Sequence, residues 1–157
     1  MEKQKEFMRE AIRLSLENVK NGYGGPFGAV IVMNGKIIAE GYNQVTSQND
    51  PTAHAEIVAI RRACDTLDTF HLTGAEIYCS CEPCPMCLAA IHWARIEKIY
   101  YANTQEDARH IGFDDYAIYE ELTKNSRERK IPISQILPKE GKAAFRAWEE
   151  KVDKTPY

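Results

Sequence analysis

The chain has 157 residues, of which 44% are hydrophobic and 27% are charged. This is the composition of an ordinary globular protein, and it excludes the intrinsically disordered and fibrous classes. A chain of this length corresponds to about one domain, and it buries enough surface to hold a core without disulfides. The formal net charge of −3 provides no electrostatic footprint for a polyanion, so we do not expect nucleic acid as a partner.

Nothing in the sequence predicts a membrane partner. No apolar run reaches the length that is needed to cross a bilayer. Four of the first six residues are charged, and the segment lacks the apolar core of a signal peptide. We therefore expect a cytoplasmic protein.

The first two thirds of the chain alternate helical and extended patterns of apolar residues. We predict, in chain order, a helix over 3–21, strands over 28–33 and 36–41, a helix over 53–67, a strand over 75–79, a helix over 85–95 and a strand over 96–101. Asn34-Gly35 is the strongest signal for a two-residue hairpin turn. Asp50 or Thr52 is the candidate N-cap of the second helix. Two successive strand–helix–strand steps imply parallel strands with helices on the faces of the sheet.

The last third of the chain is less regular. We predict a loop after residue 103, a short helix over about 116–123 and a last helix over 139–152. Residues 131–137 have the composition of a strand but contain Pro132, which favours the edge of a sheet. No repeat and no linker divides the chain.

Four of the five cysteines, Cys79, Cys81, Cys84 and Cys87, fall within nine residues. An odd and crowded set in a chain without an export signal favours metal or catalytic chemistry over disulfides. Cys84 and Cys87 are three residues apart at the start of a predicted helix, so both thiolates can reach one ion. His54, at the start of another helix, adds an imidazole, and one imidazole with two thiolates suits zinc.

Three protein ligands leave the fourth tetrahedral position of zinc open. An open position is typical of a catalytic site, where the metal acidifies a water molecule. The N-termini of the two predicted helices favour the thiolate forms of Cys84 and Cys87. Glu56, two residues after His54, is left over as a carboxylate that can move the proton of this water to a leaving group.

Two other interpretations of the cysteines stay open at this point. Cys81, Cys84 and Cys87 form the start of a ferredoxin-like run, although its completing C-x-x-x-C-P is missing. A closed structural zinc site would use Cys79 or Cys81 as a fourth ligand. Otherwise Cys64, Cys79 and Cys81 are expected to pack as small hydrophobic side chains.

The H-x-E pattern of His54 and Glu56, followed by the P-C-x-x-C pattern that ends at Cys87, resembles the zinc-dependent cytidine and nucleobase deaminase superfamily. The resemblance implies that His54, Cys84 and Cys87 bind one zinc ion per subunit and that Glu56 is the proton shuttle of a hydrolytic deamination. It also implies a three-layer α/β/α, cytidine-deaminase-like fold with a mixed sheet of about five strands. The elements match in order from about residue 28 to 101.

Three segments near the predicted zinc site bear on the substrate. Phe27 can stack on a planar base or simply pack in the core. Asn43 can hydrogen-bond a base edge or satisfy a local turn. The G-F-D-D segment over 112–115 has two interpretations. Asp114 can cap the following helix. Alternatively, a carboxylate of this segment lines the pocket, where it accepts hydrogen bonds only. Such a carboxylate would favour guanine, which presents the N1–H and the 2-amino group on one edge.

The G-F-D-D segment, the stretch over 25–43 and the aromatic last residue resemble the bacterial guanine deaminases. This resemblance implies contacts to a small purine base from Phe27, Asn43, the Ala55 backbone, Trp93, Asp115 and Tyr157. It also implies that residues 1–157 form a single deaminase domain in a homodimer, with a segment over about 120–157 exchanged between subunits. For Tyr157 the alternative is a frayed terminus.

Two other functions remain as alternatives. A tRNA-specific adenosine deaminase shares the zinc core, but it must bind a polyanion, and the acidic net charge weighs against that. A zinc-stabilised binding module without catalysis would need neither Glu56 nor an open coordination position.

Overall fold

The structure, a computed structural model, describes residues 1–157. The chain divides into two compact units, residues 1–115 and 116–157. The first unit contains α1 (Glu2–Asn21), β1 (Gly28–Met33), β2 (Lys36–Tyr42), α2 (Val45–Gln48), α3 (Ala55–Leu67), β3 (Ala75–Cys81), α4 (Pro85–Trp93), β4 (Lys98–Asn103) and α5 (Gln105–His110). The second unit contains α6 (Tyr116–Thr123), the 3-10 turn η1 (Ser126–Glu128) and α7 (Pro138–Glu150). No helix of the structure is long and apolar enough to cross a membrane.

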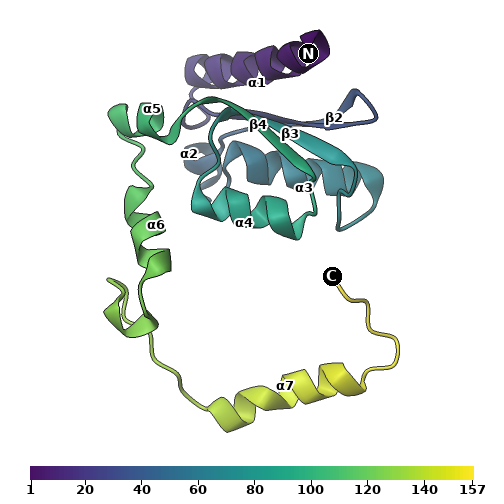
Figure 1. The fold of residues 1–157 in the computed structure, drawn as a ribbon, viewed down its shortest axis with the longest axis vertical. Helices are drawn as coiled ribbons and strands as arrows, with labels where there is room; N and C mark the ends of the chain where they lie inside the picture. The colour runs from purple at the N-terminus through teal and green to yellow at the C-terminus, as the bar shows by residue number, and fades with distance from the viewer. The chain divides into compact units, whose positions relative to one another are not determined.

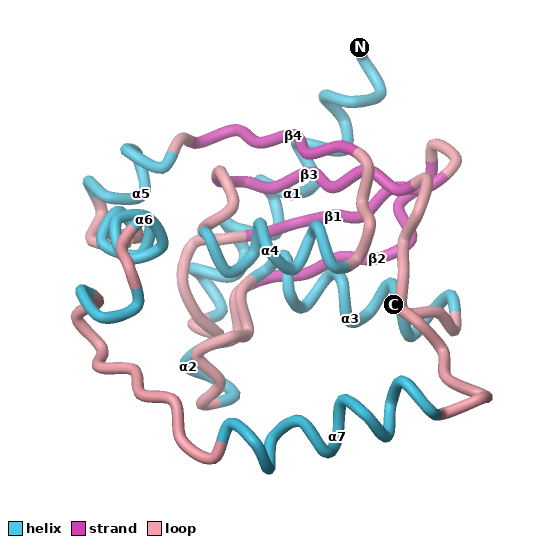
Figure 2. The backbone as a smooth tube through the Cα atoms, turned by 60° about the horizontal axis from the view of Figure 1, so that its bottom comes forward, coloured by secondary structure: helices cyan, strands magenta, loops and turns pink.

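The strands form one mixed sheet in the order β2-β1-β3-β4, as Figure 2 shows. β1 runs antiparallel to both β2 and β3, and β3 pairs in parallel with β4. Asn34 and Gly35 have φ values of 51° and 70°, which a type I′ hairpin turn requires. The predicted strand–helix–strand steps are confirmed, because β2, β3 and β4 all point the same way and α3 and α4 connect them.

The sheet has four strands rather than the predicted five. Residues 131–137, predicted as an edge strand, form no strand and pair with no other segment. Pro132 lacks an N–H to donate to a ladder, and Ile131 and Ile133 are 79% and 58% exposed. A short apolar alternation is insufficient when neither face of the segment becomes buried.

Helices cover both faces of the sheet, with α1 on one side and α3 and α4 on the other (Figure 1). Side chains alternate along β1, so that Val30 and Val32 pack with Tyr78 against α1, whereas Ala29 and Ile31 pack toward α3 and α4. The predicted three-layer α/β/α architecture is therefore confirmed. In the layer that α3 and α4 form, both helices begin beside the carboxyl end of β3.

Gly41 in β2 allows α3 to approach the sheet closely. A Cβ atom at this position would lie 2.6 Å from the backbone nitrogen of Ala59 and would collide with the carbonyl oxygen of Ala55. Because both contacts are with helix backbone, no side chain can move aside to make room. The absence of a side chain at Gly41 thus sets the distance of the first turn of α3 from the sheet.

We expect Gly41→Ala to destabilise the protein by about 1–3 kcal/mol, the usual cost of overpacking a core. The change should also lower zinc content, because it displaces the turn that follows His54. Urea unfolding and metal analysis measure the two effects. Gly141→Ala in α7 is the matched control, since its new methyl group meets nothing within 4 Å and alanine favours a helix. Equal urea midpoints for Gly41→Ala and the unchanged protein would contradict the close packing.

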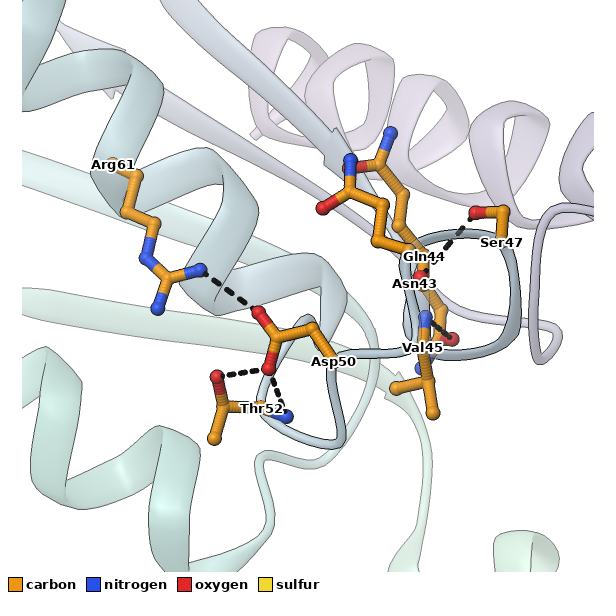
Figure 3. Close-up of polar contacts among 8 residues, drawn as sticks. Asn43, Gln44, Val45, Ser47, Asp50, Thr52 and Arg61 are labelled. Atoms are coloured by element: carbon orange, nitrogen blue, oxygen red, sulfur yellow. Dashed lines mark hydrogen bonds and ion pairs between the residues drawn. The ribbon is translucent and has the colours of Figure 1, made fainter.

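Hydrogen bonds of polar side chains stabilise the connection between β2 and α3 (Figure 3). One carboxylate oxygen of Asp50 accepts hydrogen bonds from the backbone and the hydroxyl of Thr52, at 2.8 and 2.7 Å, and the other lies 3.4 Å from Arg61 Nη1. The prediction that Asp50 or Thr52 caps α3 was wrong. Both residues are used in the preceding turn, and the N-cap is His54, whose side chain makes no capping hydrogen bond.

Candidate active site

Two helix N-termini build the site. His54 is the N-cap of α3 and Cys84 is the N-cap of α4, and both have extended backbone angles and no side-chain cap. Pro85 occupies the first position of α4, where a missing N–H costs nothing. Because the cap residues precede the regular helix, their side chains can turn across the helix ends. α3 and α4 pack against each other, which brings the two caps together.

The three predicted zinc ligands lie at ligand distance from one common point. His54 Nδ1 is 3.6 Å from Cys84 Sγ and 3.5 Å from Cys87 Sγ, and all three donor atoms lie within 4.8 Å of one another. In a tetrahedral site, with Zn–S of about 2.3 Å and Zn–N of about 2.0–2.1 Å, a nitrogen and a sulfur ligand are about 3.6 Å apart. The residues therefore fit zinc, and Nδ1 is the atom of His54 that would bind it.

The other cysteines are outside this cluster of metal-ligand atoms. Cys79 is buried, and burial raises the pKa of its thiol well above the ordinary value. The thiol of Cys81 donates to the carbonyl oxygen of Thr104 at 3.6 Å. Neither cysteine is a fourth ligand in this arrangement, so the geometry favours an open site over a closed structural one. It also offers no set of four thiolates for an iron–sulfur cluster.

Glu56 lies beside the ligands without being one of them. It is the second residue of α3 and only 8% exposed, and its Oε2 accepts a hydrogen bond from the Cys87 thiol at 3.4 Å. Burial raises the pKa of Glu56, and the negative charge of Cys84 adds to this effect. A carboxylate with a raised pKa, next to a metal-ligand cluster, is suited to accepting and returning a proton.

The thiols of Cys84 and Cys87 have very different pKa values in the metal-free site. Hydrogen bonds from Cys87 and then His54 lower the pKa of Cys84 to about 4. The hydrogen bond to Cys84, followed by burial, raises the pKa of Cys87. Without metal, Cys84 is thus the thiolate and Cys87 keeps its proton. Zinc held by both sulfurs would displace this proton, because the metal takes cysteine as thiolate.

Asn43, which follows β2, is buried, and only the oxygen of its side-chain amide makes hydrogen bonds. Its Oδ1 accepts from the backbone N–H groups of Gly25 and Val45, at 3.2 and 3.1 Å. Asn18 of α1, which is 2% exposed, donates to the carbonyl oxygens of Gly25 and Asn43, at 2.8 Å each. Figure 3 shows the Asn43 side chain turned to Val45. The oxygen therefore stabilises the local backbone, and Nδ2 is the group that remains to contact a ligand.

Phe27 and Asp115 are half-buried and lie within the same unit as the zinc-ligand cluster. The ring of Phe27 meets Phe113 edge to face, with centroids 4.9 Å apart. Asp115 Oδ1 accepts a hydrogen bond from Gln105 Nε2 at 2.7 Å. Burial, then the carboxylates of Glu56 and Asp115, raise the pKa of Cys81 to about 11. Cys81 therefore lies within electrostatic reach of both carboxylates.

The remaining predicted contact residues occupy different environments. Ala55 is 1% exposed and forms the first turn of α3 next to His54. Trp93 is the last residue of α4 and is 69% exposed. Tyr157 ends the second unit and is 76% exposed. Their contacts with a substrate stay predictions.

Sequence reasoning missed two residues that support the site. Gln105 begins α5, in a stretch that was predicted as a loop, and Asn18 lies on the core-facing side of α1. The capping box of Thr104 and Asp107 was a readable signal for the start of α5. For Asn18 the only signal was an amide side chain among apolar positions of a helix.

An α/β/α sandwich with one histidine, two cysteines and a separate carboxylate at two helix starts defines a zinc-dependent hydrolytic deaminase. Residues 1–103 match the protein family described as the cytidine and deoxycytidylate deaminase zinc-binding region. The chain belongs to this family.

Individual relatives refine the comparison. The chain is 51% identical over 151 residues to the guanine deaminase of Bacillus subtilis, a match that covers 96% of this chain and 97% of that protein. The X-ray structure of guanine deaminase from Bacillus subtilis superimposes with a TM-score of 0.95 at 50% identity and covers 98% of both chains. The tRNA-specific adenosine deaminase of Aquifex aeolicus is 40% identical over 77% of this chain and 79% of its own. A solved relative in complex with 8-azaguanine is 34% identical, with a TM-score of 0.68 over 71% of this chain and 65% of that chain.

Proposed function

We propose that the protein is a guanine deaminase, which hydrolyses guanine to xanthine and ammonia. The observation that carries this proposal is the likeness to a guanine deaminase over nearly the whole chain, including the region beyond the zinc motifs. The free base as ligand is supported by the relative that was solved with 8-azaguanine. A role in purine catabolism or salvage follows from the reaction.

The chain's own residues divide the chemistry between them. His54, Cys84 and Cys87 hold the metal, and zinc bound there activates a water molecule as the nucleophile. Glu56 accepts one proton of the attacking water and donates it to the adjacent ring nitrogen of the base. It then accepts the second proton, from the hydroxyl that has been added to the ring carbon, and donates it to the departing amine as the C–N bond breaks and ammonia forms. Its burial excludes bulk water from this transfer and raises its pKa toward neutrality, where such a shuttle works best.

We further propose that the base lies between residues that read its face and its edges. Phe27 stacks on the ring, Asn43 Nδ2 donates to an acceptor of the base, and the Ala55 backbone contacts it from the start of α3. The free oxygen of Asp115 accepts from the N1–H edge. Trp93 and Tyr157 complete the proposed contacts. The support is the placement of Phe27, Asn43 and Asp115 described above.

The second unit supports a proposal about assembly. Neither α6 nor α7 buries a residue, and Ile136, Phe145 and Trp148 are 80%, 75% and 44% exposed. Apolar side chains at these positions require a protein partner. We propose a homodimer in which residues 1–157 form one deaminase domain that is complete only when the segment over about 120–157 is exchanged. Five free cysteines fit a reducing compartment, so we place the protein in the cytoplasm.

An ammonia-release assay with guanine, adenine, cytosine, cytidine and a tRNA anticodon stem tests the function. We expect turnover of guanine alone. The second candidate, a tRNA-specific adenosine deaminase, is favoured by the 40% identity to such an enzyme. Release of ammonia from the tRNA stem, without turnover of guanine, would select that candidate and overturn ours.

We expect Asp115→Asn to raise the KM for guanine by about tenfold or more while zinc content stays unchanged. The amide replaces a charged acceptor, and a hydrogen bond to a charged group contributes about 1.5–3 kcal/mol. Steady-state kinetics and metal analysis measure both quantities. Asp114→Asn is the neighbouring control, since Asp114 is half-exposed and ion-paired with Arg109 at 3.7 Å. Unchanged guanine kinetics in Asp115→Asn would remove Asp115 as the base reader.

A further inference from the structure

We propose that Gln105 is a positioning residue for purine recognition, which orients the Asp115 carboxylate so that one oxygen faces the substrate. The inference rests on the proposed function, since it assigns how that same site discriminates among purines. It concerns contacts that lie entirely within the first unit.

The central contact is short and specific. Gln105 Nε2 donates to Asp115 Oδ1 at 2.7 Å, and both side chains are half-buried. An amide donor on one carboxylate oxygen fixes the plane of the carboxylate and leaves Oδ2 to accept from a ligand.

The backbone of Gln105 is itself held in place from β3. Its N–H donates to Glu82 Oε2 at 3.1 Å, and the N–H of Glu82 donates to the carbonyl oxygen of Asn103 at 2.8 Å. The capping box of Thr104 and Asp107 closes the same turn. These contacts anchor the start of α5 to the strand end that precedes Cys84. The side chain of Gln105 therefore extends from a point that is fixed to the segment between β3 and Cys84.

The loop after α5 folds back on that helix and brings Asp115 beside Gln105. The N–H of Phe113 donates to the carbonyl oxygen of Ala108 at 3.0 Å, while Gly112 adopts a φ of 97° to make the turn. The Phe113 ring packs on Phe27. Without Gln105, this loop would still fold back, but no described side chain would fix the rotation of the Asp115 carboxylate. The role we assign to Gln105 is thus one of orientation and not of folding.

Orientation has a consequence for selectivity. Guanine carries a proton on N1, whereas 2,6-diaminopurine presents a bare N1 acceptor at the same edge. A fixed carboxylate oxygen accepts a hydrogen bond from N1–H of guanine. It repels the lone pair on N1 of 2,6-diaminopurine, because a carboxylate oxygen can only accept hydrogen bonds. A rotating carboxylate loses part of this discrimination.

We expect Gln105→Leu to raise the KM for guanine by about five- to tenfold, the value of one ordinary hydrogen bond. The guanine to 2,6-diaminopurine ratio of kcat/KM should fall by a similar factor, with kcat for guanine and zinc content nearly unchanged. Glu106→Gln is the control on the same helix, because Glu106 is exposed and pairs only with Arg109 and His110. It should behave like the unchanged protein.

Gln105→Glu adds a readout that a purely structural role would not move. Two carboxylates at hydrogen-bond distance share one proton, and the pKa of the pair rises. The other charged or titratable groups around the pair are Cys81, Glu82, Arg109 and Asp114. At low pH the shared proton replaces the amide donor, whereas at higher pH the two charges repel. Relative to the unchanged protein, kcat/KM for guanine should acquire an additional ionisation and fall as pH rises through it.

The outcomes separate this inference from the function on which it rests. If the unchanged protein turned over no guanine, the proposed function would fail and the inference with it. If guanine is a substrate but Gln105→Leu keeps the same KM and the same base preference, only the inference is overturned. Loss of zinc in Gln105→Leu would also overturn it, because Gln105 would then support the fold instead of the recognition.

Discussion

Replacement of Glu56 by glutamine is expected to leave zinc content at one ion per chain and to reduce kcat for guanine by at least about 100-fold. Glutamine keeps the volume of the side chain, but it can neither accept the proton of a water molecule nor return one to the leaving amine. Glu56 is not among the three ligand side chains, so the metal should stay bound. Metal analysis and steady-state ammonia release on the same sample measure the two results together.

A second glutamate provides the matched control for this change. Glu76 in β3 is half-buried and accepts a hydrogen bond from the Tyr78 hydroxyl at 2.7 Å, on the face of the sheet that α1 covers. Glu76→Gln removes a partly buried carboxylate on the side opposite the zinc cluster, and it should retain full turnover. Near-normal activity in Glu56→Gln would reject the assignment of Glu56 as the proton shuttle.

The metal cluster was predictable from the sequence because its chemistry is local to two helix starts. Cys84 and Cys87 sit on one turn, and His54 caps the other helix. The one geometric difficulty, that His54 and Glu56 are two residues apart, disappears because His54 has an extended backbone and only Glu56 is helical. Residue type and short spacing carry this information, and the sheet need only bring the two helices together.

The errors in secondary structure have three separate causes. Residues 131–137 look like a strand by composition, but a strand forms only when another strand completes its ladder. α5 was missed because the stretch after β4 is short and polar, and its capping box was not used as a signal. Asp50 resembles a helix cap, yet it satisfies the turn before the helix.

The contacts made by the proposed substrate-binding residues are harder to predict than the metal-ligand cluster. Gln105 hydrogen-bonds Asp115, which lies 10 residues later in the chain. Asn18 hydrogen-bonds the backbone of Asn43, which lies 25 residues later. No spacing rule connects such pairs, because the path between them depends on how a loop returns. The structure was therefore needed to identify which side chain bonds each group that we propose to contact the base.

The second large effect is expected from Cys84→Ser, which should lose zinc as well as activity. Serine matches cysteine in shape, but its hydroxyl remains protonated near neutral pH and is a poor zinc ligand. Loss of a supporting contact outside the ligand set already weakens metal binding about 10–100-fold, so loss of a direct ligand should cost at least about 100-fold in zinc affinity. Titration of the metal-free protein with zinc, followed by a competing chelator, measures this affinity without any turnover.

Comparison of the two variants distinguishes the metal ligands from the proton shuttle. Glu56→Gln should bind zinc normally and be inactive, whereas Cys84→Ser should be inactive because zinc is missing, with its folded core retained. Cys64→Ser is the control for the cysteine change, since Cys64 is half-buried in α3 and lies outside the ligand cluster. It should keep both zinc and activity. Unchanged zinc affinity in Cys84→Ser would contradict a three-ligand site, because the 3.6 Å separation between Cys84 Sγ and His54 Nδ1 would then serve no coordination.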